Sequence, residues 1–206
     1  MKKLLFLVTV IAVFASCNNS PERKANDLIK EEMKKTLYHV ESYDPVETIV
    51  DSAFSPKDDP ELIGLLTDAA DLGREYESYE SKAKRAKSSM AIWGGPYQSE
   101  YDRIQYNEKK QEYEEAYAKA EKIKEKGKKM YADICSKLSA QPKFIGFKAI
   151  HKYRAQNNAG QTVFGNTVFI IDDKFEKVLF SCDEEDYKQI QEAFDQVLEE
   201  FNVVEN

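Results

Sequence analysis

Two long runs with helical apolar spacing, joined by one short turn, constrain the fold of this 206-residue chain more than any other feature. From Leu62 to Met90, apolar residues recur at steps of three and four, close to the 3.5-residue average of a coiled-coil seam. Similar steps return from Ala116 to Leu138. Between them, Trp93-Gly94-Gly95-Pro96-Tyr97 interrupts any helix. We therefore expect residues 58–140 to form an antiparallel helical hairpin.

Each run provides one apolar stripe. The first stripe consists of Leu62, Leu66, Ala69, Leu72, Tyr76, Tyr79, Ala83, Ala86 and Met90. The second consists of Ala116, Ala120, Ile123, Gly127, Met130, Ile134 and Leu138. At 1.5 Å per residue, such runs give an arm of roughly 45–55 Å. Because glycine costs a helix about 1 kcal/mol relative to alanine, we expect Gly127 to face a bulky partner such as Tyr76 or Tyr79 at a close approach of the two helices.

The segments on either side of the hairpin, residues 22–57 and 141–206, have the pattern of one small α+β domain. Ser20-Pro21 has the residue types of a helix start. Apolar and polar alternation predicts a strand over 43–54 and three strands between 142 and 181, followed by a final helix. We expect a mostly antiparallel sheet of about four strands, with the first and last helices covering its apolar face. The hairpin is then an insertion after the first strand.

The N-terminus has the three parts of a secretory signal. Met1-Lys2-Lys3 is basic, residues 4–14 are apolar apart from Thr9, and small residues precede Cys17. Because the apolar run is too short to span a bilayer, we interpret residues 1–16 as a cleaved signal. The Ala-Ser-Cys ending resembles the lipobox of bacterial lipoproteins, which implies that Cys17 is lipidated. The alternative is an ordinary cleaved signal with a chance cysteine.

Removal of the signal leaves 190 residues with a net charge of −9, because Lys2 and Lys3 leave with it. An acidic chain lacks the basic face that phosphates need, which argues against nucleic acid as a partner. Anionic lipid headgroups would also repel it, so membrane attachment is expected to depend on the lipid at Cys17, with residues 17–21 as a tether. The other cysteines, Cys135 and Cys182, have no motif around them, which is more typical of separately buried thiols than of a disulfide.

Two further segments resemble small bacterial envelope proteins. One is Leu37-Tyr38 followed by Glu41-Ser42-Tyr43-Asp44-Pro45, and the other runs from Gly146 to Gly160 through Tyr153-Arg154-Ala155. The whole chain is similar to uncharacterised lipoproteins of Bacteroides-type bacteria. This resemblance implies a small α+β domain anchored by lipid in the bacterial cell envelope, and it brings no catalytic residues. The segment after Cys17 lacks the early acidic run associated with surface export in these bacteria, so we expect a periplasm-facing position.

Candidate chemistry is sparse. His151 shares the apolar face of a predicted strand with Tyr153, and this pair is a weak candidate for a pocket. No glycine-rich nucleophile turn accompanies His151, so a hydrogen-bonded buried histidine is the simpler interpretation, and we predict no catalytic residue. Motifs with metal-ligand spacing are lacking, so we predict no metal site and no cofactor. The balanced charges from Glu121 to Lys129 predict a solvated surface.

The turn between the two helices holds the only tryptophan of the chain, Trp93, together with Tyr97. Aromatic side chains at a hairpin tip have little core to enter and are typical of interface centres, so we predict that both bind a partner. The competing interpretation is that they cap the hairpin by packing on Met90, Ile92 and Tyr101.

Two classes of function remain open. We favour a non-enzymatic envelope protein of the binding or scaffolding type, whose helical arm presents an aromatic tip to a partner protein or ligand. The alternative is a small-ligand-binding or hydrolytic module that uses a pocket on the sheet face. A filled sheet face would favour the first class, and a deep pocket lined by His151, Tyr153 and an acid would favour the second.

Overall fold

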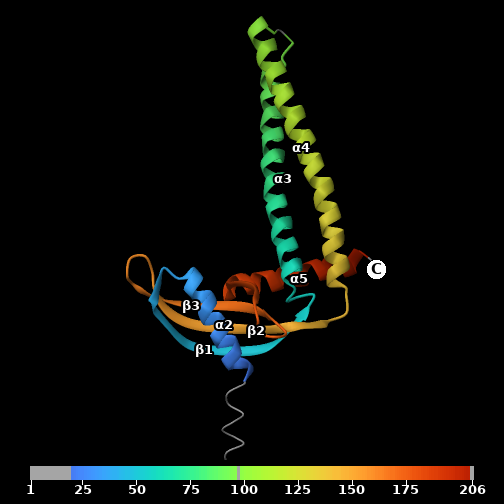
Figure 1. Cartoon of the computed structure of the whole chain (residues 1–206). Helices are drawn as coiled ribbons and strands as arrows, with labels where there is room; N and C mark the ends of the chain where they lie inside the picture. Colours follow the sequence, from blue (N-terminus) through green and yellow to red (C-terminus); the bar gives the residue numbers. More distant parts are fainter. Residues whose placement is uncertain (1–19, 97, 205–206) are drawn as a thin grey trace, which may run out of the picture. The chain divides into compact units, whose positions relative to one another are not determined.

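The computed structural model describes residues 20–96 and 98–204. Its elements in chain order are α2 (Pro21–Thr36), β1 (His39–Ser55), α3 (Pro60–Trp93), α4 (Glu100–Leu138), β2 (Lys143–Gln156), β3 (Thr162–Asp172), β4 (Val178–Asp183) and α5 (Glu184–Val204) (Figure 1). The strands form one antiparallel sheet in the order β1-β2-β3-β4. The predicted α+β fold, with a long helical insertion after the first strand, is confirmed.

The chain divides into two compact units. The first, which we call the sheet domain, contains α2, the four strands and α5; the second, the helical hairpin, spans Glu61–Ser139. The predicted signal over residues 1–16 and the lipidation site Cys17 lie outside the described residues. Ser20 caps α2 and Pro21 is its first residue, so these two positions of the predicted tether belong to the helix.

One face of the sheet is covered by α2. The helix begins where the Ser20 hydroxyl accepts a hydrogen bond from the backbone N–H of Arg23 at 3.3 Å, satisfying a donor that the first turn leaves unpaired. Its apolar stripe then meets β2 and β3. The buried cluster that results consists of Ala25, Ile29, Met33, Ala149, Phe169 and Ile171.

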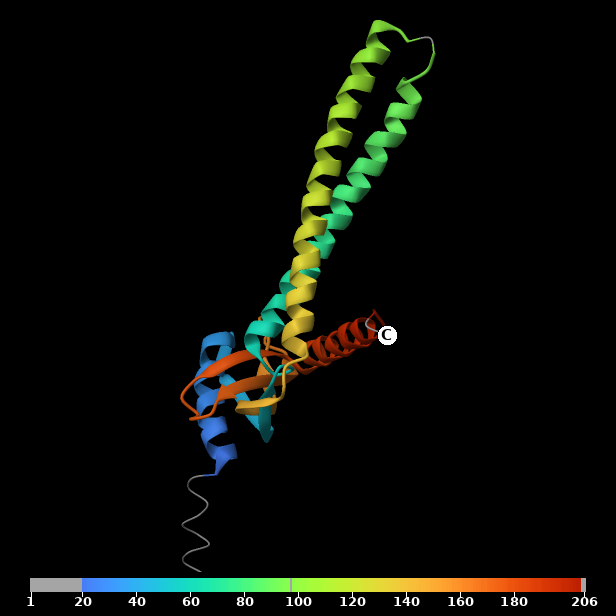
Figure 2. The same cartoon turned by 90° about the vertical axis from the view of Figure 1, so that its right-hand side faces the viewer.

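The opposite face of the sheet carries α5. Lys148 precedes Ala149 on β2 and therefore points to the other face, where its Nζ lies 3.4 Å from the Tyr187 hydroxyl of α5. Figure 2 shows α2 and α5 on opposite sides of the strands. The expectation that both helices cover one apolar face is wrong, because residues 168–171 of β3 are all buried and so present apolar side chains to both faces.

The helical hairpin consists of α3 and α4, which run alongside each other in both views (Figures 1 and 2). None of the predicted stripe positions is exposed. The most deeply buried are Leu62, Leu72, Ala83, Ala86, Ala116, Ala120, Ile134 and Leu138. The start of α4 is defined by a capping box, in which Ser99 and Asp102 each accept a hydrogen bond from the other's backbone N–H. None of the described helices has both the length and the apolar character needed to cross a membrane.

Gly127 lies opposite Leu72, not opposite Tyr76 or Tyr79. A Cβ atom at Gly127 would lie 3.8 Å from Cδ2 of Leu72, which is an ordinary van der Waals distance. The predicted close approach is therefore wrong, although the residue that Gly127 faces, Leu72, is bulky. A methyl group fits at this position without displacing its neighbour.

We expect Gly127→Ala to stabilise the protein by up to about 1 kcal/mol, because alanine is the better helix former and its methyl group meets only Leu72. Thermal unfolding followed by circular dichroism should show a midpoint raised by a few degrees. Gly73→Ala on α3 is the control, since no atom lies within 4 Å of its added Cβ. If Gly127→Ala lowered the midpoint while Gly73→Ala raised it, the space between Gly127 and Leu72 would be too small for a methyl group, contrary to the structure.

Candidate functional site

His151 lies at the centre of a buried hydrogen-bonded cluster in the sheet domain. Its side chain has no exposed surface, its Nε2 lies 2.7 Å from the Tyr43 hydroxyl, and its Nδ1 lies 2.8 Å from Oγ1 of Thr48. The Thr48 hydroxyl donates its single proton to Oδ1 of Asn26 on α2. The Thr48 oxygen must then accept from Nδ1–H, and Nε2 accepts from the Tyr43 hydroxyl. The neutral imidazole is thus satisfied at both nitrogens.

The electrostatics of this cluster keep it neutral. Burial lowers the pKa of His151 to about 4, and burial also raises the pKa of Tyr43 to about 12. Because the Nδ1 proton already points at the Thr48 oxygen, His151 cannot accept the proton of that hydroxyl. The arrangement connects α2, β1 and β2, which is typical of a buried histidine that stabilises the fold.

Tyr153 packs beside His151, with ring centroids 5.7 Å apart and planes 13° from parallel. It lines a hollow of about 240 Å³ together with Glu32 and Asp183, whereas His151 does not reach that hollow. Small-molecule sites usually enclose roughly 300–1,000 Å³. A second hollow of about 380 Å³, lined by Tyr43 and by residues of α2 and β1, also excludes His151. Neither of these two hollows in the described part of the chain combines His151, Tyr153 and an acid.

A second buried polar cluster surrounds Asp58, which follows β1. Its carboxylate accepts hydrogen bonds from the Tyr187 hydroxyl, from the backbone N–H of Phe54 at 2.8 Å and from Lys148 Nζ at 3.1 Å. Burial, and then the hydrogen bond to Asp58, raise the pKa of Tyr187 far above its ordinary value. The charge of Asp58 is compensated by Lys148, so the cluster secures α5 to the sheet and offers no free reactive group.

The hairpin tip has the opposite character, because apolar side chains are exposed there. The exposed fraction is 74% for Ile92, 62% for Tyr101 and 50% for Ile104. Trp93 is half-buried, and its ring meets that of Tyr101 edge to face with centroids 5.9 Å apart. We call Ile92, Trp93, Tyr101 and Ile104 the tip cluster. Tyr97, the second predicted binding residue, lies outside the described residues.

The tip cluster differs in composition from the sequence prediction. Trp93 packs on Tyr101, as the capping interpretation requires, and most of the exposed apolar surface belongs to its neighbours. Ile104 is a residue that the sequence analysis missed, and Ile92 enters that analysis only as a packing partner. Both isoleucines are apolar but lie off the two stripes, and this signal identifies them as side chains without a place in the hairpin seam.

The described residues supply little chemistry elsewhere. Among them, no group of three or more His, Cys, Asp or Glu side chains is placed to hold a metal ion. Cys135 and Cys182 are free thiols, and burial raises the pKa of Cys182 to about 11. A thiol with so high a pKa is a poor nucleophile at neutral pH.

Comparison with known proteins does not assign the chain to a family. No family model, curated protein or solved structure matches it. The functional argument therefore depends on the satisfied polar clusters of the sheet domain, which offer no reactive group, and on the exposed apolar side chains of the tip cluster. The sheet domain exposes apolar side chains as well, among them Phe164 and Tyr38.

The buried neutral histidine predicts that stability depends on pH. Histidine in the unfolded chain titrates near pH 6.5, whereas burial lowers the pKa of His151 in the folded protein to about 4. Between these pH values the unfolded state binds more protons. The stabilisation that is complete above about pH 6.5 is therefore lost as the pH falls toward 4, by roughly 2–3 kcal/mol.

Denaturant unfolding near pH 7 and near pH 4 measures this loss. His151→Gln should be less stable than the wild type at pH 7 and should lack this part of the pH dependence. His39→Gln changes the only other histidine of the chain and should keep the wild-type dependence. If His151→Gln retained the full pH dependence of stability, the assignment of His151 as a neutral, hydrogen-bonded side chain would be incorrect.

Proposed function

We propose that this chain is a lipid-anchored protein of the bacterial cell envelope that acts by non-enzymatic binding or scaffolding, with the hairpin tip as the surface that meets a partner protein. The observation that carries the proposal is the exposure of Ile92, Tyr101 and Ile104 at one end of a largely charged hairpin. The partner class is an envelope protein that offers an apolar pocket of matching size.

The energetics of the tip cluster support binding. Leaving a large apolar side chain in water forgoes about 1.5–3 kcal/mol relative to full burial. Since the seam is filled by the two stripes, these side chains do not stabilise the pairing of α3 with α4. Aromatic anchors are typical of interface centres, and the contact between Trp93 and Tyr101 holds two of them in place before binding.

The length of the hairpin supports a role in reach. The 34 residues of α3 extend about 50 Å. The tip is therefore about one helix length from Pro60 and Ser139, where the hairpin joins the sheet domain. Ion pairs such as Lys84–Glu80 and Lys128–Glu125 cover the shaft. Exposed pairs of this kind contribute little to stability, and their main effect is to keep the shaft solvated.

The sheet domain gives less support to the alternative, a ligand-binding or hydrolytic module. A catalytic base must reach a substrate proton, whereas His151 is buried and already engaged at both nitrogens. The side chains of α2 fill the face on which His151 lies. We therefore favour the binding function over hydrolysis.

Site-specific photocrosslinking in intact cells tests the tip. A photoreactive residue at Ile92 should yield a discrete crosslinked species. The same residue at Tyr117 should not, because Tyr117 is a half-exposed aromatic position of α4 away from the tip. The double variant Ile92→Ser and Ile104→Ser should remove the species formed from a probe at Tyr101. Equal crosslinking from Ile92 and Tyr117 would exclude the tip as the binding surface.

The same double variant reports on folding. We expect its thermal midpoint to stay within a few degrees of the wild type, because Ile92 is mostly exposed to water and Ile104 is half exposed. A drop of some ten degrees would show that these isoleucines pack structurally, and the loss of crosslinking would then have another cause.

Lipidation at Cys17 is tested by phase partitioning. Cys17→Ala should move the protein from the detergent phase to the aqueous phase or block removal of the signal. Cys182→Ala, a second cysteine substitution, should leave the partitioning unchanged. Protease added to whole cells should not cleave a periplasm-facing protein. Normal processing of Cys17→Ala with unchanged partitioning would refute the lipid anchor.

A further inference from the structure

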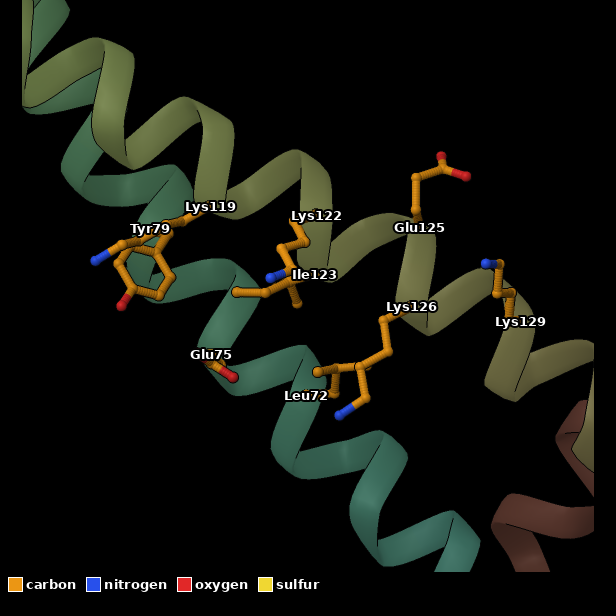
Figure 3. Close-up of a pocket in the computed structure, with 9 residues that line it drawn as sticks. All are labelled: Leu72, Glu75, Tyr79, Lys119, Lys122, Ile123, Glu125, Lys126 and Lys129. Atoms are coloured by element: carbon orange, nitrogen blue, oxygen red, sulfur yellow. The ribbon is translucent and has the colours of Figure 1, made fainter.

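A groove of about 590 Å³ lies between α3 and α4 in the middle of the hairpin (Figure 3). Leu72 and Tyr79 of α3 and Ile123 of α4 supply its apolar floor. The volume falls within the range of small-molecule sites. The groove is distinct from the tip cluster, and the proposed partner-binding function does not involve it.

Four lysines of α4 form the rim of the groove: Lys119, Lys122, Lys126 and Lys129. Their spacing of three, four and three residues places them on one helix face, over about 15 Å. Figure 3 shows Lys119 and Lys126 reaching from α4 toward α3, where Tyr79 and Leu72 lie. The Nζ of Lys119 lies 5.1 Å from the centre of the Tyr79 ring, a cation–π contact that holds this ammonium group above the apolar floor.

The rim lysines differ from the other lysines of this segment in their ion pairing. Lys124 and Lys128 pair with Glu121 and Glu125 at 3.6 and 2.7 Å. Within the described part of the chain, by contrast, no carboxylate oxygen lies within 4.0 Å of a rim ammonium group. The charges that balance along the sequence are therefore separated in space, with paired residues beside the groove and unpaired ammonium groups on its rim.

The lining therefore carries a local positive charge in a chain whose formal net charge is −7. Two carboxylates complete the lining, Glu75 and Glu125. Glu125 is already paired with Lys128, and its side chain points away from α3 in Figure 3. Glu125 also interacts electrostatically with Lys129 of the rim. The lining thus holds four ammonium groups against two carboxylates, and this excess of positive charge attracts anions although the whole chain repels them.

We propose that this groove binds a single-chain anionic amphiphile, with the apolar tail along Leu72, Tyr79 and Ile123 and a carboxylate head on the rim lysines. The groove volume fits one small molecule, and its length suits an extended tail. A small inorganic anion would leave the apolar floor in water, and a neutral lipid would leave the ammonium groups without a partner. Tail burial supplies the affinity, and the lysines select the charge.

Fluorescence titration with dansyl-undecanoic acid tests the proposal. Residues 17–206, which remain after removal of the signal, are used with Cys17→Ala in every variant, so that neither a lipid nor the apolar signal requires detergent or binds the probe. The acid should bind saturably at one site, and its uncharged methyl ester should bind about tenfold more weakly, since it cannot make charge-assisted contacts. Absence of saturable binding, or equal affinity for acid and ester, would overturn the proposal.

Two matched double variants locate the site on the rim. Lys122→Gln with Lys126→Gln should weaken binding of the acid about tenfold, through loss of two charge-assisted contacts. Lys110→Gln with Lys124→Gln removes the same charge from the same helix outside the groove lining and should change the affinity by no more than about twofold. If both double variants weakened binding of the acid equally, the loss would be due to net charge alone, and the proposed site on the rim would be wrong.

A third arm separates an amphiphile from a free anion. Inorganic phosphate at millimolar concentration should fail to displace the probe, because it has no tail to occupy the floor. Displacement by phosphate would assign the rim to small anions and contradict the proposal. Thermal midpoints of both double variants should equal that of the parent chain, since all four substituted side chains are exposed. None of these results depends on crosslinking at the tip cluster.

Discussion

The sheet domain depends on the need to keep one apolar segment of β3, residues 168–171, out of water on both sides. All four of these side chains are buried. Alternate residues of a strand point to opposite faces, so a continuous apolar run requires a cover on each face. α2 covers one face through Ala25 and Ile29, and α5 lies on the other, where Tyr187 meets Lys148. This part of the antiparallel sheet is thus covered on both sides, an arrangement more common for parallel sheets.

This double cover determines what the sheet domain can do. A polar group that is enclosed between a helix and a sheet must find hydrogen-bond partners within the protein. His151 finds Tyr43 and Thr48, and Asp58 finds Lys148 and Tyr187. These contacts satisfy the polar groups of the two clusters within the protein. Its polar residues mainly stabilise one arrangement of helices and strands.

The hairpin separates stability from interaction more clearly. Stripe residues such as Ala83 and Ala120 are buried and pair the two helices. Residues off the stripes do not contribute to that pairing. Among them are the apolar side chains of the tip cluster and the lysines on the rim of the groove. A long helical pair can therefore carry two distinct surfaces, one apolar and one cationic, without altering the seam that stabilises it.

The sequence by itself determined the periodic features of the protein. The spacing of three and four predicts α3, α4 and their seam, and alternation with turn residues predicts four strands, because local geometry forces side chains onto one face at those periods. The sequence pattern did not determine which residues face each other across the seam. Gly127 faces Leu72 because of the axial shift of one helix relative to the other, and no local pattern encodes that shift. The continuous apolar run over 168–171 indicates a strand that is covered on both faces. The prediction of a sheet with one apolar face did not take this run into account.

Only the tertiary structure decided which polar and charged groups meet. Tyr43 and His151 are more than a hundred residues apart in the chain, and their hydrogen bond exists only once β1 pairs with β2 beneath α2. The charges around Lys126 balance in sequence but separate in space, because a helix turns acids and lysines of one segment toward different sides. Periodicity is a local property, whereas contact and charge separation depend on how elements pack, and the candidate binding surfaces arise from that packing.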